Sequence, residues 1–371
     1  MEDKIIQRLT SEAIQLLKEM IAIPSPSFHE DQVCSHISDW LASKGVEHER
    51  IGNNIIAEHV VDPSKPTLML CAHIDTVSPC EGYTFDPYKP ENCPEGMIQG
   101  LGSNDDGASV VSMIAAYRYY LIGNSDTITP DIKTNLTLAL TCEEERSGKD
   151  GMTGLWGKRL DKIDYAIVGE PTGMTAATSE RGLLVIDATA HGVSGHAARN
   201  EGKNALYIAL EDIEKLRRHE FIKVSPRMGK VNLNVTQISA GNAHNVIPDR
   251  CGFVIDIRPT EQYTNEEILQ ELQEICQSEL KPRNLANRSS ATHEESPLQK
   301  TAEKLGIDTF SSATTSDWMR ITCDAIKMGP GDSARSHRKD EFVTVEEVKE
   351  GIEKYIRFIR SLDFARDDRS E

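Results

Sequence analysis

The chain has 371 residues and a formal net charge of −18 at pH 7. This length allows two domains with sizeable cores, and the hydrophobic content of 38% is typical of a globular protein. The excess of acidic residues argues against a nucleic-acid partner, because a phosphate backbone would be repelled. No apolar run reaches the length of a membrane span, and the first residues lack a secretory signal pattern. We therefore expect no membrane partner.

The eight cysteines are scattered along the chain and form no C-x-x-C pair. Cys71, Cys142 and Cys251 lie in apolar segments that resemble strands. This usage is typical of reduced, buried thiols. It predicts a cytoplasmic protein in which cysteine does not bind zinc.

The first half of the chain alternates helical and strand patterns. Apolar residues at helical spacing predict a helix over residues 11–22 and a second one that ends before Gly45. An apolar helix is expected over residues 108–121. Strands are predicted at residues 54–60, 67–72, 136–142 and 165–168. Acidic residues follow several of these strands, which indicates an α/β layer with its chemistry at the carboxyl ends of strands.

Residues 177–288 show a different rhythm. Strands and helices follow one another there as in a small antiparallel α+β unit, with strands at 183–190, 231–239 and 252–257 and helices at 204–218 and 265–277. The polar stretch 281–295 is predicted to be a return linker. The α/β character then resumes with a strand at 325–328 and a helix at 344–361, and the charged tail 363–371 is expected to be disordered. The prediction is an α/β catalytic domain, 1–176 and 289–371, interrupted by an inserted α+β domain, 177–288.

The stretch Leu68–Val77 is the strongest candidate for a functional strand end. Five apolar residues lead to His73 and Asp75, which are two positions apart and therefore share one side of the chain. A carboxylate in this position can hold the free N–H of a metal-bound imidazole and fix its tautomer. Taken alone, the same stretch also fits an ordinary histidine with satisfied hydrogen bonds.

Further candidates fall at the ends of other predicted strands or in loops: Asp105, Glu144, Glu145, Glu170 and His337. Carboxylates and imidazoles without cysteine suit zinc, manganese or cobalt, and a shared carboxylate allows two ions about 3.5–4 Å apart. A glutamate that is not a ligand could then act as a general base on a water molecule. Each motif alone has an ordinary explanation: a solvated acidic loop for 143–145, a turn at Glu170, and a loop histidine at His337.

The joint order of the motifs is much more specific than any one of them. H-x-D, G-x-G-x-x-D, a glutamate pair, G-E-P-T and G-P-G before His337 follow one another along the chain. This order resembles the M20 family of metallopeptidases and deacylases, and the resemblance extends from about residue 10 to 361. It implies a zinc-peptidase-like catalytic domain, with a mixed sheet and helices on both faces, and an inserted lid domain that dimerises.

The resemblance also implies a role for each candidate. Two divalent metal ions, zinc in the first place and otherwise cobalt or manganese, would be bound by five ligands with Asp105 shared: His73, Asp105 and Glu170 for one ion, and Asp105, Glu145 and His337 for the other. Glu144 would be the general base and Asp75 would orient His73. A cis peptide bond is expected after Asp105.

Three lid residues gain roles from the same resemblance. His196 would donate to the developing oxyanion from the partner subunit, and Arg258 and Asn245 would hold the α-carboxylate of the substrate. In isolation, His196 could equally be a turn residue and Arg258 a surface ion pair.

Two departures from the family pattern leave questions open. The family's D-x-K-G reads Asp105-Asp106-Gly107 here, so the lysine is missing. Three consecutive glutamates also allow a second register, with Glu143 as base and Glu144 as ligand.

The sequence thus predicts a metal-dependent hydrolase that removes an acetyl or succinyl group from a small N-acyl amino acid. An acetylornithine deacetylase of arginine biosynthesis is the first choice, followed by a succinyl-diaminopimelate desuccinylase and a dipeptidase. A homodimer is expected. A metal-binding relative without catalysis and a purely structural dimer are the competing classes, but neither needs a glutamate pair beside the ligands.

Overall fold

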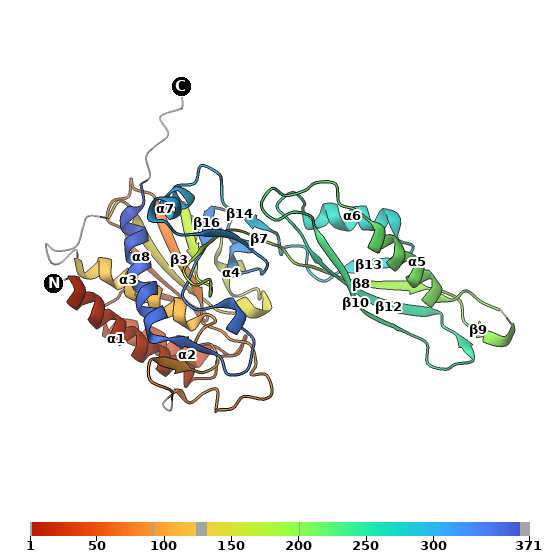
Figure 1. The fold of residues 1–371 in the computed structure, drawn as a ribbon, viewed down its shortest axis with the longest axis horizontal. Helices are drawn as coiled ribbons and strands as arrows, with labels where there is room; N and C mark the ends of the chain where they lie inside the picture. The colour runs from red at the N-terminus through yellow and green to blue at the C-terminus, as the bar shows by residue number, and fades with distance from the viewer. Residues whose placement is uncertain (1, 91–92, 124–131, 200, 364–371) are drawn as a thin grey trace, which may run out of the picture. The chain divides into compact units, whose positions relative to one another are not determined.

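The computed structural model describes residues 2–90, 93–123, 132–199 and 201–363, and the chain forms two compact units. Unit 1 comprises Met1–Thr178, Thr292–Phe310 and Ser316–Glu371, and unit 2 comprises Ser179–Ala291 and Ser311–Thr315 (Figure 1). Apart from Asp363, the tail that was expected to be disordered lies outside the described residues.

Unit 1 is built on a mixed sheet. Its strands lie in the order β1 (Glu49–Ile51), β2 (Asn54–His59), β5 (Asn135–Thr141), β3 (Thr67–His73), β6 (Tyr165–Val168), β16 (Asp324–Lys327) and β7 (Ala176–Glu180). The pairs β5–β3, β3–β6 and β6–β16 are parallel, and β1, β2 and β7 pair antiparallel. The short strand β15 (Thr309–Ser312) also pairs with β7, and β14 (Ser290–Ala291), which belongs to unit 2, pairs with Ser179 and Glu180 of the same unit.

The central parallel strands bring their carboxyl ends to one edge of this sheet. Every residue of β5 is buried, as are all residues of β3 after the first, which explains the uninterrupted apolar run from Leu68 to Ala72 in β3. The register pairs His73 with Thr141 and Cys71 with Val168. Residues that follow β3, β5 and β6 are therefore neighbours in space.

Helices cover both faces of the sheet, but unequally. One core cluster joins a face of the sheet to the helices α1 (Glu2–Ile21), α2 (Asp31–Ser43), α3 (Gly107–Gly123), α7 (Pro297–Leu305) and α8 (Val345–Ser361). The opposite face packs against the short helix α4 (Met152–Leu155) and a 3-10 turn at Asp317–Arg320, where Trp318 is buried. No helix in the described part of the chain is long and apolar enough to cross a membrane.

Unit 2 has its own sheet and core. The antiparallel strands lie in the order β10 (Asn232–Ala240), β12 (Arg250–Arg258), β8 (Leu184–His191) and β13 (Glu279–Pro282). In β8 and β12 buried residues alternate with half-buried ones, and the buried side chains form one cluster with α5 (Ala205–Arg218) and α6 (Asn265–Ile275). Figure 1 shows these two helices beside the sheet. A short ladder pairs β9 (Gly195–His196) with β11 (Val246–Ile247). The predicted fold class, an α/β domain with an α+β insertion, is confirmed.

Two predicted elements were wrong in extent. The helix expected over 11–22 begins at Glu2, because its apolar stripe continues back to Leu9 and Ile5 and its first turn is acidic, which favours a helix start. The expected linker 281–295 includes the end of β13, whose Leu280 is buried against β8. The strand was missed because only one side of β13 is apolar, so the segment is polar in composition.

Candidate metal centre

The first ligand candidate, His73, is the last residue of β3 and only 2% exposed. Its Nδ1 lies 2.9 Å from the backbone carbonyl oxygen of Asp75 and 3.4 Å from the carboxylate Oδ1 of the same residue. The imidazole is thus held by the backbone of Asp75 at least as closely as by its carboxylate. This contact to Nδ1 leaves Nε2 available as a ligand atom.

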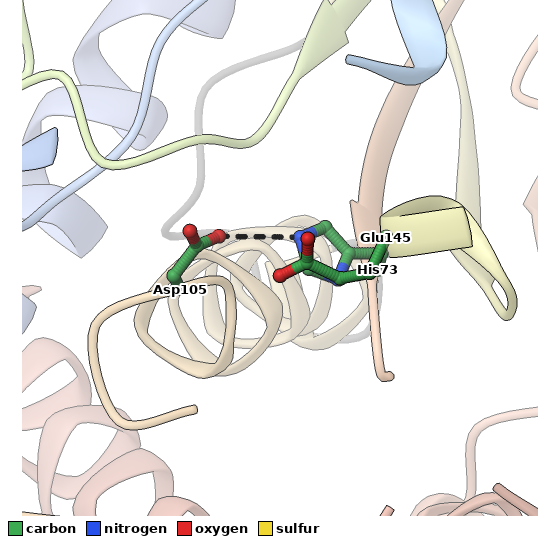
Figure 2. Close-up of side chains that lie close together, drawn as sticks. All are labelled: His73, Asp105 and Glu145. Carbon is green, nitrogen blue, oxygen red and sulfur yellow. Dashed lines mark hydrogen bonds and ion pairs between the residues drawn. The ribbon is translucent and has the colours of Figure 1, made fainter. Parts of the chain in front are cut away.

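Asp105 lies in the loop before α3 and faces two histidines. Its Oδ1 is 3.3 Å from His73 Nε2, and its Oδ2 is 3.6 Å from His337 Nε2. Figure 2 shows the contact between Asp105 and His73, with the carboxylate of Glu145 beside the imidazole. One oxygen toward each histidine is the arrangement expected of a shared carboxylate. The peptide bond between Asp105 and Asp106 is cis, as the resemblance implied.

The three consecutive glutamates point in different directions. Glu143 adopts a left-handed conformation with φ 60°, and its Oε2 accepts a hydrogen bond from the Asp150 amide at 3.1 Å. The amides of Glu144 and Glu145 donate to the carboxylate of Asp75 at 3.0 and 3.2 Å. Asp75 therefore holds this turn as well as His73.

Two overlapping groups of side chains have donor atoms close enough to share an ion. In each group the ligand atoms lie within 4.8 Å of one another: His73, Asp105 and Glu145 in one, and His73, Glu144 and Glu170 in the other. His337 joins the first group through its Nε2, which is 2.9 Å from Glu145 Oε1. All five expected ligands thus gather at one edge of the sheet, and Glu144 lies among them.

The burial of several carboxylates beside two histidines shifts the pKa values of this cluster. Burial raises the pKa of Glu144 and of Glu170 well above the usual range. Burial alone would lower the pKa of His73, but the carboxylates of Asp105 and Asp75 outweigh it and raise that pKa. The hydrogen bond to Glu145 raises the pKa of His337 to about 9. Without a cation, these carboxyl groups and imidazoles therefore hold their protons more tightly than isolated side chains do.

This donor set fits divalent metal ions. Buried imidazole nitrogens and carboxylate oxygens, without cysteine, are ligands that zinc, cobalt and manganese accept. Burial is the main cause of the raised pKa values of Glu144 and Glu170, and neighbouring carboxylates add to it; a bound cation would favour the charged carboxylates against both effects. The residues present can therefore hold the ions that the sequence implied.

The lid candidates lie in unit 2 and are arranged differently. His196, in β9, is exposed, and its Nδ1 accepts a hydrogen bond from the Ala198 amide at 3.2 Å. Asn245 is exposed and immediately precedes β11. Arg258, at the end of β12, makes a two-pronged ion pair with Asp256, at 2.9 and 3.2 Å. The side-chain contacts of His196 and Arg258 are local, whereas the backbone places His196 opposite Val246, next to Asn245.

The structure adds two buried charged residues that the sequence did not single out. Asp317 accepts a hydrogen bond from the Thr141 hydroxyl at 2.7 Å, and burial raises its pKa to about 6. Lys327, in β16, is 1% exposed, and its charge lowers the pKa of Glu170 against the stronger effect of burial. A lysine inside an apolar strand was a possible signal, since buried lysines are rare. It supplies a buried positive charge near the site although the lysine of the D-x-K-G pattern is missing.

Comparison with known proteins identifies relatives for both units. The family model described as a peptidase dimerisation domain matches residues 178–284. A succinyl-diaminopimelate desuccinylase from Wolbachia pipientis subsp. Culex pipiens is 26% identical, over 94% of this chain and 92% of the relative.

Solved structures share the whole fold. An M20 family metallo-carboxypeptidase from Sulfolobus solfataricus has a TM-score of 0.74 at 16% identity, with 95% of this chain and 99% of that chain covered. A dinuclear metal binding peptidase of the M20 family from Bacillus subtilis has a TM-score of 0.72 at 15% identity, covering 96% and 98% of the two chains. These likenesses show that nearly the whole chain has the fold of these solved structures.

Proposed function

From the premise that this chain is an M20-family, metal-dependent amide hydrolase, we propose that it releases the acyl group of a small N-acyl amino acid. The observation that carries the proposal is the placement of Asp105, with one carboxylate oxygen toward His73 and the other toward His337. Such a shared carboxylate suits a pair of divalent ions, and zinc is our first choice for both.

The five ligands divide into two overlapping sets in this proposal. His73, Asp105 and Glu170 hold one ion, and Asp105, Glu145 and His337 hold the other. The ions, when bound, supply Lewis-acid activation of the amide carbonyl and of a water molecule. Asp75 keeps His73 in one orientation and holds the glutamate turn, through the contacts at Nδ1 and at the two amides.

Glu144 is the proposed general base. It removes a proton from the attacking water at its carboxylate and returns a proton to the leaving amine. Burial raises its pKa well above that of a free glutamate, the direction that makes a carboxylate a stronger base. The register with Glu144 as base and Glu145 as ligand is supported by two contacts: Glu145 meets His337 at 2.9 Å, and Glu143 is engaged by the Asp150 amide.

The lid residues are proposed to complete the site of a partner subunit. Since the Nδ1 of His196 accepts the Ala198 amide, the proton of the neutral ring is on Nε2, which can donate to an oxyanion. Arg258 and Asn245 would bind the α-carboxylate, and Asp256 holds the guanidinium until the substrate arrives. The match of residues 178–284 to a dimerisation domain supports a homodimer.

The acyl group is a choice between two closely related activities. The sequence motifs led first to an acetylornithine deacetylase, whereas the relative from Wolbachia is named as a succinyl-diaminopimelate desuccinylase and aligns over 92% of its length. That name favours succinyl over acetyl. At 26% identity the side chains that read the acyl group can differ, so both substrates belong in the test.

The decisive experiment is a panel of acetyl and succinyl derivatives of ornithine, citrulline and diaminopimelate, with kcat/KM measured for the zinc-loaded and the cobalt-loaded protein. Glu144→Gln serves as the inactive control. We expect one derivative to be hydrolysed clearly faster than the others. If the metal-loaded protein hydrolyses none of them, nor any dipeptide, the proposal of a deacylase is wrong and a metal-binding relative without catalysis becomes the better account.

We further propose that the protein works in the cytoplasm. All eight of its cysteines are free, and four of them, Cys34, Cys71, Cys142 and Cys251, are buried. Unpaired thiols in this number are typical of a reducing compartment.

A further inference from the structure

Glu341 is a buried carboxylate that neither the motifs nor the proposed chemistry uses. It lies four residues after His337, immediately before β17 (Phe342–Thr344), and is 2% exposed. Its Oε1 accepts hydrogen bonds from the amides of Asn104 and Asp105 at 2.9 and 3.0 Å, and its Oε2 accepts one from the Gly102 amide at 3.1 Å. One side chain thus satisfies three backbone donors of the loop that carries Asp105.

The backbone of the same segment holds the beginning of this loop. The carbonyl oxygen of Glu341 accepts a hydrogen bond from the Gly100 amide at 3.0 Å. The next residue, Phe342, pairs with Gln99 in the ladder between β17 and β4 (Met97–Gln99). The loop is therefore tied to the segment around Glu341 from its first residue to Asp105.

The loop from Gly100 to Asp105 is closely packed and has a second attachment to the rest of the chain. Gly102 has φ +75°, and a Cβ added there would lie 2.6 Å from Thr76 Cγ2, so a side chain has no room. Asn104 adds a second attachment, because its side chain exchanges two hydrogen bonds with the backbone of Asp332, at 3.1 and 2.9 Å. The aim of the Asp105 carboxylate therefore depends on contacts made by residues more than 200 positions later in the chain.

We propose that Glu341 is a positioning residue, which fixes the loop so that Asp105 presents one oxygen to each histidine. This inference rests on the proposed function, since it assumes that Asp105 is the ligand shared by two ions. It gives a distinctive expectation. Loss of Glu341 should weaken both ions together, whereas loss of Glu145 or Glu170 should weaken one.

The test is the metal affinity of the full-length protein, measured by competition with a chelator and by elemental analysis. In Glu341→Gln the amide nitrogen must face at least one backbone N–H, so one hydrogen bond is replaced by a repulsive contact. We expect zinc and cobalt to bind about 10-fold more weakly at both positions in Glu341→Gln, and about 100-fold more weakly in Glu341→Ala, the range found for partners of metal ligands.

Glu347→Gln is the matched control. Glu347 belongs to the same segment, accepts the Thr344 amide at 2.8 Å in a capping box at the start of α8, and pairs with Arg335 at 2.9 Å. Among the described residues, its side-chain hydrogen bonds and ion pairs are to Thr344 and Arg335, not to the loop that carries Asp105. Its replacement should lower the melting temperature and leave metal affinity unchanged.

Two results would overturn the proposal. One is unchanged affinity for both ions in a folded Glu341→Gln protein, or weakening of one ion alone. The other is an equal loss of affinity in Glu347→Gln, which would show a general effect of stability. If Glu341→Ala does not fold, the isosteric Gln variant decides. Because the readout is binding and not turnover, a wild-type protein that binds two ions but hydrolyses no N-acyl amino acid contradicts the proposed function and leaves this inference intact.

Discussion

The candidate residues of unit 1 and those of unit 2 are held in opposite ways. In unit 1, His73 is 2% exposed and lies within 3.4 Å of carboxylate oxygens from two different segments. In unit 2, His196 is exposed. Its side chain accepts a hydrogen bond from the amide of a residue two positions along the chain, and its backbone pairs with Val246. The imidazole is therefore held by a carboxylate from a distant segment in one unit and by a neighbouring backbone amide in the other.

This difference indicates which functions each unit can perform alone. The cluster around Asp105 brings together all five proposed ligands within unit 1, so metal binding needs no second subunit. Arg258 has its guanidinium occupied by Asp256, two residues away on the same strand. The side chains of His196 and Arg258 are thus anchored by groups two residues away, as expected for groups that serve a substrate held elsewhere.

The largest effect should come from removing the metal, because all of its proposed ligands lie in unit 1. Chelation is expected to abolish hydrolysis of N-acyl amino acids, and added zinc or cobalt should restore it, because neither the carbonyl nor the water is activated without the ions. Activity before and after dialysis, together with elemental analysis, measures this. An active preparation with well under one transition metal per chain would contradict the prediction.

The next largest effect should come from replacing Glu144, because this substitution affects catalysis without affecting metal binding in the same cluster. Glu144→Gln should lower kcat by at least ~10²-fold and keep both ions, since the carboxamide cannot accept the proton of water. Glu145→Ala should instead lose the ion shared with His337. Kinetics and metal content are measured on the same samples. A swap of the two phenotypes, or their appearance at Glu143 and Glu144, would show that the register is wrong by one.

A third experiment joins the two regions through the dimer. His196→Ala should lose ~10²–10³-fold in kcat, the usual effect of removing an oxyanion donor. Mixing and reassembling it with Glu144→Ala should give heterodimers in which one of the two sites contains both residues. With random pairing, half of the dimers have half of their sites intact, so about a quarter of wild-type activity should return.

Subunit exchange must be demonstrated for this test, for example with two differently tagged chains. If the subunits exchange and no activity returns, His196 acts within its own chain, and the comparison of self-contained and shared residues fails.

Strand geometry explains why the sequence could bring part of the unit 1 cluster together, whereas the ligand roles, and the places of Asp105 and His337 in loops, came from the family resemblance. Buried parallel strands end at one edge of a sheet, so residues such as His73 and Glu170 approach one another whatever the loops do. The lid roles came from the family resemblance, because an exposed histidine in a glycine-rich turn has no periodicity that marks it.

The supporting residues could not be predicted for a different reason. Glu341 contacts amides 236 residues earlier in the chain, and an Asp-Glu pair before a short strand is an ordinary surface pattern. Asp75 illustrates the same limit, since its spacing predicted a contact to His73 but not the two hydrogen bonds to the glutamate turn. Long-range hydrogen bonds depend on how loops pack, which local propensities do not contain.

The smallest expected effect concerns the pH dependence of the metal-free protein. The hydrogen bond to Glu145 raises the pKa of His337 to about 9, from about 6.5 in an unfolded chain. Between these values the folded protein binds more protons than the unfolded one, so this contribution is complete below pH 6.5 and is lost as the pH rises toward 9. Solvent screens the contact, because the His337 side chain is 54% exposed, and we expect a change of only a few degrees in melting temperature.

The measurement is the melting temperature of the metal-free protein from pH 6.5 to 9, compared with His337→Asn and with the zinc-loaded wild type. Asparagine does not titrate, so the decrease should be smaller in His337→Asn. In the zinc-loaded protein a coordinated His337 is neutral and carries no proton to lose, so the decrease should be smaller there as well. A decrease of the same size in all three samples would show that His337 is not held by Glu145 as a proton donor. The ligand cluster would then have to be stabilised, without metal, by contacts other than this one.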